Sequence, residues 1–234
     1  MKNVLLTGGS KGLGLEVLKV FLQNDWNVYN VSRTRPDIDD ERLHHKSFDL
    51  EDTDSAKAEI FRNFLTTRIP IHAAVHNAAI AYDDIVTNCK ITPLEKMYSV
   101  NVLTPIMMNR EIIRNMIFNK IRGSIVFVSS ISSQTGYKGL SMYASTKGAI
   151  EAHSKNIARE WGIRGIRSNC VVPGFMETDM SSTLTKEQKN KIYNRNSMRQ
   201  PTDMNSVAET IYFLSSDKSN SITGQNINVD CGTI

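Results

Sequence analysis

Residues 4–14 read VLLTGGSKGLG, and this stretch decides the fold. The run Val4–Thr7 predicts a short buried strand that leads directly into a glycine-rich loop, after which a helical pattern begins. The glycines have G-x-x-x-G-x-G spacing, at Gly8, Gly12 and Gly14. In a strand–loop–helix unit this spacing is typical of a dinucleotide site, because any Cβ would hold the pyrophosphate away from the backbone N–H groups.

Two other interpretations of the loop are possible. Gly14 is followed by Leu15-Glu16 rather than by Lys and Ser or Thr, so the loop lacks the signature of a Walker loop and an NTPase is disfavoured. An ordinary tight turn remains open as the alternative to a dinucleotide site.

The rest of the chain alternates short apolar runs with helical patterns. Predicted strands are Val4–Thr7, Asn27–Ser32, Ile71–His76, Ser124–Ser129, Ser168–Val172 and Asn226–Val229, with Lys46–Asp49 as a weaker candidate; predicted helices are Leu13–Asn24, Asp54–Leu65, Pro93–Phe118 (broken at Pro105), Tyr143–Trp161 and Ser206–Leu214. The segment between Arg33 and Lys46 is too short for a full helix. We therefore expect one α/β domain over residues 1–234: a doubly wound, Rossmann-type parallel sheet of about seven strands, with helices on both faces.

Composition excludes several classes of protein. The 234 residues carry 28 Lys and Arg against 24 Asp and Glu, a net charge of +4, without the clustered basic patch of a nucleic-acid-binding protein. No apolar stretch approaches the roughly 18 residues of a membrane span. We expect a soluble, cytoplasmic protein with no nucleic-acid or membrane partner. The three cysteines lie far apart and the five histidines fit no HExxH pattern, so no metal is expected.

Charge after the second predicted strand indicates which dinucleotide would bind. This strand leads into Arg33-Thr34-Arg35, and no acid follows until Asp37. An acid here would hold the ribose 2′-hydroxyl of NAD, whereas arginine suits a 2′-phosphate. Lys11 in the glycine loop can add a second positive charge. The pattern favours NADP(H); the alternative is that both arginines are simply solvated.

A candidate proton-transfer pair opens the fourth predicted helix. Tyr143 and Lys147 have i,i+4 spacing, which places the phenol and the ammonium on one face. The ammonium is expected to lower the pKa of the phenol and bring it toward working pH. Ser130 follows the preceding strand and could polarise a substrate carbonyl.

Four features in order carry a family resemblance: Thr7–Gly14, His76-Asn77-Ala78-Ala79, Ser130 with Tyr143 and Lys147, and Pro173-Gly174 followed by Met176 and Thr178. Over essentially its full length the chain resembles the classical short-chain dehydrogenase/reductases. Within them it is most similar to bacterial 3-oxoacyl-acyl-carrier-protein reductases, in residues 173–180 and in the ending from Ile222 to Gly232.

The resemblance implies a catalytic tetrad of Asn101, Ser130, Tyr143 and Lys147. Tyr143 would protonate the carbonyl oxygen during hydride transfer, Ser130 would hold that oxygen, and Lys147 would bond the nicotinamide ribose. Asn101 would anchor a water that links Lys147 to solvent. Cofactor contacts would come from Gly8, Ser10, Lys11, Gly12, Leu13, Gly14, Arg33, Asp49, Leu50, Asn77, Ala78, Tyr143, Lys147, Pro173, Gly174, Met176 and Thr178.

Departures from the family pattern are also visible. His76-Asn77-Ala78-Ala79 replaces the family's Asn-Asn-Ala-Gly, so Ala79 adds a methyl group near the cofactor and should cause a small shift. His76 is expected to serve in packing or hydrogen bonding rather than in catalysis. The lid, about residues 181–200, is polar and lysine-rich and indicates no clear substrate.

Partners and substrate remain open. The small residues Ala144, Gly148 and Ala152 fit either packing on the chain's own sheet or the helix contact of a homodimer or homotetramer, as the family builds. Lys120, Arg122, Arg164 and Arg167 could form a basic rim near the active-site mouth for an acidic acyl carrier, as in fatty acid biosynthesis. The alternatives are a reductase or dehydrogenase of a sugar, polyol or secondary-metabolite ketone, and a regulator that senses NADP(H) without turnover.

Overall fold

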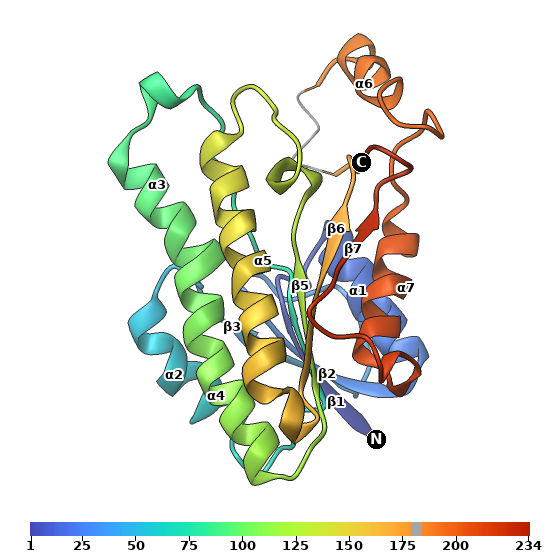
Figure 1. Cartoon of the computed structure of the whole chain (residues 1–234). Helices are drawn as coiled ribbons and strands as arrows, with labels where there is room; N and C mark the ends of the chain where they lie inside the picture. The colour runs from blue at the N-terminus through green and yellow to red at the C-terminus, as the bar shows by residue number, and fades with distance from the viewer. Residues whose placement is uncertain (179–183) are drawn as a thin grey trace.

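The computed structural model describes residues 1–178 and 184–234. Within these residues seven parallel strands form one sheet, in the order β3-β2-β1-β4-β5-β6-β7, with helices on both faces (Figure 1). The strands are β1 (Lys2–Thr7), β2 (Trp26–Ser32), β3 (Leu43–Ser47), β4 (Ala73–His76), β5 (Ser124–Val128), β6 (Arg167–Pro173) and β7 (Asn226–Val229). The helices are α1 (Gly12–Gln23), α2 (Thr53–Phe61), α3 (Ile91–Tyr98), α4 (Thr104–Phe118), α5 (Ser141–Trp161), α6 (Lys186–Tyr193) and α7 (Met204–Ser215). The predicted doubly wound α/β fold is confirmed.

The central strands are apolar throughout because both faces of the sheet are covered. In β1, Leu5 packs into the core beneath α2, α4 and α5, whereas Val4 and Leu6 pack into the core beneath α1 and α7. All three are at most 1% exposed. Alternate residues of a strand point to opposite faces, so a strand covered on both sides needs no polar positions. In the described ranges, no helix combines the length and apolar character that crossing a membrane would require.

The long helical pattern at 93–118 is interrupted, as predicted, but by a different feature. Helix α3 ends at Tyr98, a π-helical turn occupies Ser99–Leu103, and α4 begins at Thr104. Pro105 lies in the first turn of α4, directly after the π-helical turn. The interruption therefore precedes the proline, and it matters because this turn carries Asn101.

Two elements differ from the sequence prediction. Edge strand β3 begins three residues before the predicted Lys46–Asp49, because its pairing with β2 starts at Leu43. Helix α6, within the predicted lid, is absent from the helical patterns of the sequence. It begins with a reciprocal capping box, in which Thr185 accepts from the backbone N–H of Gln188 and the Gln188 side chain accepts from that of Thr185.

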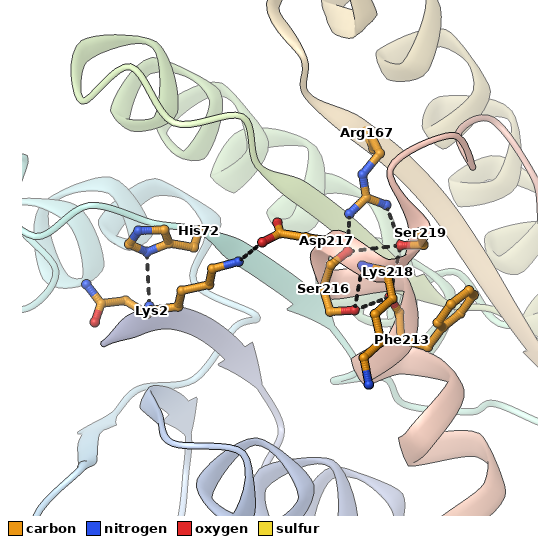
Figure 2. A network of polar contacts seen from close by, with 9 residues as sticks. Lys2, His72, Arg167, Phe213, Ser216, Asp217, Lys218 and Ser219 are labelled. Atoms are coloured by element: carbon orange, nitrogen blue, oxygen red, sulfur yellow. Dashed lines mark hydrogen bonds and ion pairs between the residues drawn. The ribbon is translucent and has the colours of Figure 1, made fainter.

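At the amino ends of the parallel strands, where β6 begins, a buried arginine caps the carboxyl end of α7. The Arg167 guanidinium donates to the main-chain carbonyl of Leu214 at 2.8 Å. It also donates to the main-chain carbonyl of Ser216 (2.9 Å) and to the Ser219 hydroxyl (2.9 Å), as Figure 2 shows. Carbonyls in the last turn of a helix have no partner within the helix. Arg167 therefore supplies donors that the helix itself lacks there.

Candidate active site

The carboxyl ends of the strands gather the predicted site residues along one edge of the sheet, the upper edge in Figure 1. The strand order reverses between β1 and β4, which lie side by side at the centre. Ligands of open α/β sheets bind at such a switch point. The glycine loop after β1 and the segments after β4, β5 and β6 all leave the sheet at this edge.

The glycine loop folds back closely on itself. Gly12 has a φ of +54°, in the left-handed region that favours glycine. Gly14, in the first turn of α1, lies so close to the loop that an added Cβ would be 2.0 Å from the main-chain oxygen of Gly8. Ser10 and Lys11 complete the turn, and Leu13 is buried in the core below it.

The end of β4 is bonded to this loop. The Asn77 side-chain amide donates to the main-chain oxygens of Thr7 (3.2 Å) and Gly8 (3.1 Å). The Thr7 hydroxyl in turn accepts from the backbone N–H groups of Asn77 and Ala78, both at 3.1 Å. The two predicted cofactor segments, 8–14 and 77–78, therefore form one connected unit.

The residues present fit a dinucleotide. A Cβ added to Gly12 would have one neighbour within 4 Å, the Thr178 methyl group at 3.9 Å, so this face of the loop is open and Thr178 lies across from it. The first turn of α1 contains no acidic residue. Its backbone N–H groups and the positive end of the helix dipole suit a phosphate.

On the adenine side the charge is mixed. Arg33 follows β2, is exposed, and its main-chain oxygen accepts from the Ser47 hydroxyl (2.9 Å). A nearby cavity of about 360 Å³ is lined by residues 35–39, which include one arginine and two aspartates. Asp37, the first acid after the second strand, and Asp39 thus lie on the segment that follows Arg33.

Asp49 and Leu50 follow β3. Leu50 is buried, and its main-chain oxygen accepts from the Thr104 hydroxyl at 2.7 Å, which ties the segment to the start of α4. The Asp49 carboxylate accepts from the backbone N–H of Glu51 at 3.1 Å. Both residues lie at the carboxyl edge of the sheet, on the side where the predicted cofactor contacts gather.

Tyr143 and Lys147 occupy the first two turns of α5. The Lys147 ammonium lies 5.4 Å from the centroid of the Tyr143 ring and donates to the main-chain oxygen of Val128 at 2.8 Å. Burial lowers the pKa of Lys147 to about 8. The expected lowering of the Tyr143 pKa is wrong for this structure: burial and the nearby Asp83 carboxylate raise it. The phenol is therefore protonated at neutral pH.

Ser130 and Asn101 complete the predicted tetrad. The Ser130 hydroxyl accepts from the Ser132 backbone N–H (3.2 Å) and its hydroxyl (3.0 Å), which fixes it at the end of β5. Asn101 accepts from the backbone N–H of Ile80 (2.9 Å) and donates to the Thr146 hydroxyl (3.1 Å), next to Lys147. The four residues are thus connected through the ends of β4 and β5 and the start of α5.

The segment after β6 is fixed by contacts with the C-terminal part of the chain. Pro173 ends β6, and the Gly174 backbone N–H donates to the main-chain oxygen of Val229 (2.9 Å). A Cβ on Gly174 would lie 2.5 Å from the Thr202 hydroxyl. Met176 and Thr178 continue the segment toward the glycine loop.

Between them, Glu177 connects this segment to α6. The Glu177 carboxylate accepts from the Tyr193 hydroxyl (2.6 Å) and from the Lys189 ammonium (3.1 Å). Sequence reasoning missed this contact with the predicted lid. Residues 181–183 of that lid lie outside the described residues.

His76 is part of the core rather than of the catalytic group. Its ring stacks on Phe127 (centroids 4.9 Å apart), and its Nε2 pairs with the Asn109 side-chain oxygen at 2.8 Å. Burial lowers the pKa of His76 to about 4, so the imidazole is neutral at physiological pH. The prediction of packing and hydrogen bonding agrees with this placement.

The predicted basic rim near the active-site mouth is wrong within one chain. Lys120 and Arg122 precede β5, and Arg164 and Arg167 precede or begin β6, so all four lie at the amino ends of strands whose carboxyl ends carry Ser130 and the segment after Pro173. Arg167 is also only 8% exposed, because it bonds the end of α7. Loop positions on either side of a strand are close in sequence but lie at opposite edges of the sheet.

Comparison with known proteins agrees with this geometry. A family model described as enoyl-(acyl carrier protein) reductase matches residues 11–233. The chain is 32% identical to 3-oxoacyl-[acyl-carrier-protein] reductase of Chlamydia pneumoniae, over 99% of this chain and 96% of that protein. It is 31% identical to carbonyl reductase [NADPH] 2 of Sus scrofa, over 97% of this chain and 94% of that protein.

Among solved structures, 4-hydroxyisoleucine dehydrogenase complexed with NADH has a TM-score of 0.94 at 23% identity, covering 100% of this chain and 98% of that one. At this identity the likeness establishes the fold and not the substrate.

Proposed function

The chain belongs to the short-chain dehydrogenase/reductase family, and we propose that it is an NADP(H)-dependent reductase of a ketone, with a 3-oxoacyl group on a carrier as the first substrate candidate. That it is an oxidoreductase follows from the family. The observation that best supports a catalytic role is the placement of Lys147 between the Tyr143 ring and the main-chain carbonyl of Val128. Val128 is two residues before Ser130 in the chain.

Each tetrad residue has a role in this proposal. The nicotinamide, when bound, supplies the hydride. Tyr143 gives its phenolic proton to the carbonyl oxygen as a general acid, and its raised pKa keeps the phenol protonated at neutral pH. Ser130 donates a hydrogen bond to the same oxygen, while Lys147 bonds the nicotinamide ribose and Asn101 anchors the route by which Lys147 is reprotonated.

The proposed cofactor contacts follow the edge of the sheet. When bound, the pyrophosphate would be held by Gly8, Ser10, Lys11, Gly12, Leu13 and Gly14, and the carboxamide by Pro173, Gly174, Met176 and Thr178. The adenosine-side ribose would contact Asn77 and Ala78, and the adenine would contact Asp49 and Leu50. Arg33, with Lys11, favours a 2′-phosphate, and the [NADPH] in the name of the porcine relative supports this choice. The two aspartates at 37 and 39 act against it.

A small carbonyl compound is the second substrate candidate, supported by the porcine carbonyl reductase at nearly the same identity as the carrier-linked enzyme. The position of the four basic residues at the amino edge also removes one argument for carrier docking. We expect the purified chain to oxidise NADPH with a 3-oxoacyl-carrier substrate, ethyl acetoacetate or a ketose. Activity only with the small ketones would favour the second candidate, and NADPH binding without turnover of any would favour the regulator.

We also propose a homo-oligomer built on the outer face of α4 and α5. A Cβ on Gly148 would meet nothing within 4 Å and Ala152 is exposed, so the small-residue row does not pack on the chain's own sheet. On α4 and just before it, Met107 and Leu103 are 39% and 49% exposed. Sedimentation of the parent and of Gly148→Arg tests this: we expect a dimer or tetramer that the variant dissociates, and a monomeric parent would contradict it.

A further inference from the structure

A carboxylate that the proposed chemistry does not use is buried behind the catalytic residues. Glu151 lies on α5, eight residues after Tyr143 and four after Lys147, so the three side chains share one face of the helix. Glu151 is 9% exposed. Burying an ionised carboxylate costs free energy unless hydrogen bonds and a positive charge compensate it. The partners of Glu151 therefore indicate its role.

Three donors converge on Glu151 from three elements. Its Oε1 accepts from the hydroxyls of Ser129 and Ser133, each at 2.5 Å, and its Oε2 accepts from the Asn226 amide at 2.7 Å. Ser129 follows β5, Ser133 lies in the short helical turn Ile131–Ser133, and Asn226 begins β7. Glu151 thus holds both sides of the segment that contains Ser130.

The same segment carries the partner of Lys147. Its first residue, Val128, accepts the hydrogen bond of the Lys147 ammonium. At its other end the Ser133 hydroxyl lies between the main-chain oxygen of Ser130 (2.6 Å) and Oε1 of Glu151 (2.5 Å), and it donates its single hydrogen to one of these two oxygens at a time. A shift of residues 128–133 would therefore displace Ser130 and Lys147 together.

We propose that Glu151 is a positioning residue for the reaction: its carboxylate fixes residues 128–133, and with them Ser130 and Lys147, while its negative charge keeps the Lys147 ammonium protonated. The test of this inference by enzyme activity rests on the proposed function. Its test by NADPH affinity does not need turnover of any substrate.

The charge on Lys147 depends on the titratable groups that face it. In the described part of the chain these are Tyr143 and Glu151 on its own helix and Cys170 on β6. Burial lowers the pKa of Lys147, and Cys170 and Glu151 act in the opposite direction. Because burial raises the pKa of Cys170 to about 12, that thiol is uncharged at neutral pH. Tyr143, itself beside Asp83, holds its proton, so Glu151 supplies the negative charge.

Position is tested with two serine variants. Ser133→Ala removes the hydroxyl between Glu151 and Ser130. Ser154→Ala removes a buried hydroxyl of α5, which bonds Ser168 on β6 (2.8 Å). With ethyl acetoacetate and NADPH, we expect kcat of Ser133→Ala to fall about tenfold, as for the loss of one hydrogen bond to a charged group. Ser154→Ala should keep kcat within about twofold. Equal losses in both variants would overturn positioning through Ser133.

Charge is tested with Glu151→Gln and Glu151→Asp. Among the described residues, nothing donates to the side-chain oxygen of Asn226, so the Asn226 amide can turn over and accept from the new amide of Glu151→Gln without losing a bond. Only the charge is then removed. We expect the alkaline midpoint of NADPH affinity, followed by fluorescence titration across pH, to move about one unit lower in Glu151→Gln. In Glu151→Asp, which keeps the charge, it should stay near the parent value.

The outcomes separate this inference from the proposed function. A midpoint that does not move in Glu151→Gln, or that moves equally in Glu151→Asp, would overturn the charge role of Glu151. A parent that binds NADPH but reduces no ketone would instead remove the proposed function, and the midpoint would still decide the role of Glu151. A parent that binds no dinucleotide would overturn both.

Discussion

The Lys147 ammonium donates a 2.8 Å hydrogen bond to the main-chain oxygen of Val128, the last residue of β5. Lys147 is 3% exposed, so this bond forms in a region from which water is largely excluded. Burial lowers the pKa of Lys147 to about 8, which leaves the amine mostly charged at neutral pH and sensitive to nearby charge. Tyr143, one helical turn earlier, is positioned by the same attachment of α5 to the sheet.

Tyr143→Phe should remove most turnover and leave NADPH affinity nearly unchanged. The phenyl ring fills the same space, but the proton donor is lost, and general acid catalysis is worth about 10²–10⁴-fold. Steady-state kinetics and fluorescence titration measure the two effects. Tyr212→Phe is the control, since Tyr212 packs against Phe21 on the opposite face of the sheet. Full activity of Tyr143→Phe would place the chemistry elsewhere.

Arg33→Asp should weaken NADPH binding about ten- to a hundredfold and leave NADH binding little changed, because one charge-assisted contact with the 2′-phosphate is lost. Arg68→Asp is the control; this exposed arginine precedes β4, at the amino edge of the sheet. Both affinities are measured by titration. An unchanged ratio of the two affinities in Arg33→Asp would contradict the NADP(H) assignment.

Gly14→Ala should destabilise the fold and impair dinucleotide binding. The new methyl group would lie 2.0 Å from the Gly8 oxygen, so the loop must shift, at a cost of about 1–3 kcal/mol. At Gly162 an added Cβ meets nothing within 4 Å, and the backbone there is helical (φ −55°), so Gly162→Ala should be neutral or slightly stabilising. Thermal unfolding and NADPH titration of both variants test this contrast.

Arg167→Leu should lower the free energy of unfolding by about 3 kcal/mol, because the buried carbonyls of Leu214 and Ser216 each lose a hydrogen bond from a charged donor. For a chain of this size that corresponds to a Tm lower by roughly 6–12 °C. Lys2→Met, which breaks the exposed ion pair with Asp217 (Figure 2), should cost less than about 1 kcal/mol. Similar Tm values for the two variants would contradict the role given to Arg167.

Acid should destabilise the protein through His76. Burial holds the folded-state pKa of His76 at about 4, below the unfolded value of about 6.5, so the unfolded chain binds more protons between these two pH values. The free energy of unfolding contributed by His76 is therefore intact above pH of about 6.5 and falls as the pH is lowered toward about 4, by up to about 3 kcal/mol. His76→Asn, which restores the family residue, should flatten this part of the profile in denaturant titrations. An equal acid slope in both proteins would show that His76 does not titrate on unfolding.

The sequence by itself determined the fold class and the edge of the sheet at which the candidate site lies. The strands are short, uninterrupted apolar runs, and such runs are stable only where helices cover both faces of the sheet. The glycines after β1 are required by local sterics, because a Cβ on Gly14 would lie 2.0 Å from the Gly8 oxygen. Tyr143 and Lys147 could be paired in advance because i,i+4 spacing is a property of the helix alone. Such features depend on residues that are close in the chain, so a pattern can reveal them.

Only the tertiary structure decided which edge of the sheet a loop residue occupies and what surrounds a buried charge. Arg164 and Arg167 could be assigned to the active-site mouth from the sequence, but the direction of β6 carries them to the other end. Glu151 looked like one more charged helix residue until the fold brought it to Ser133 and Asn226. These contacts join residues up to 75 positions apart, and their energies depend on burial, which no local pattern encodes.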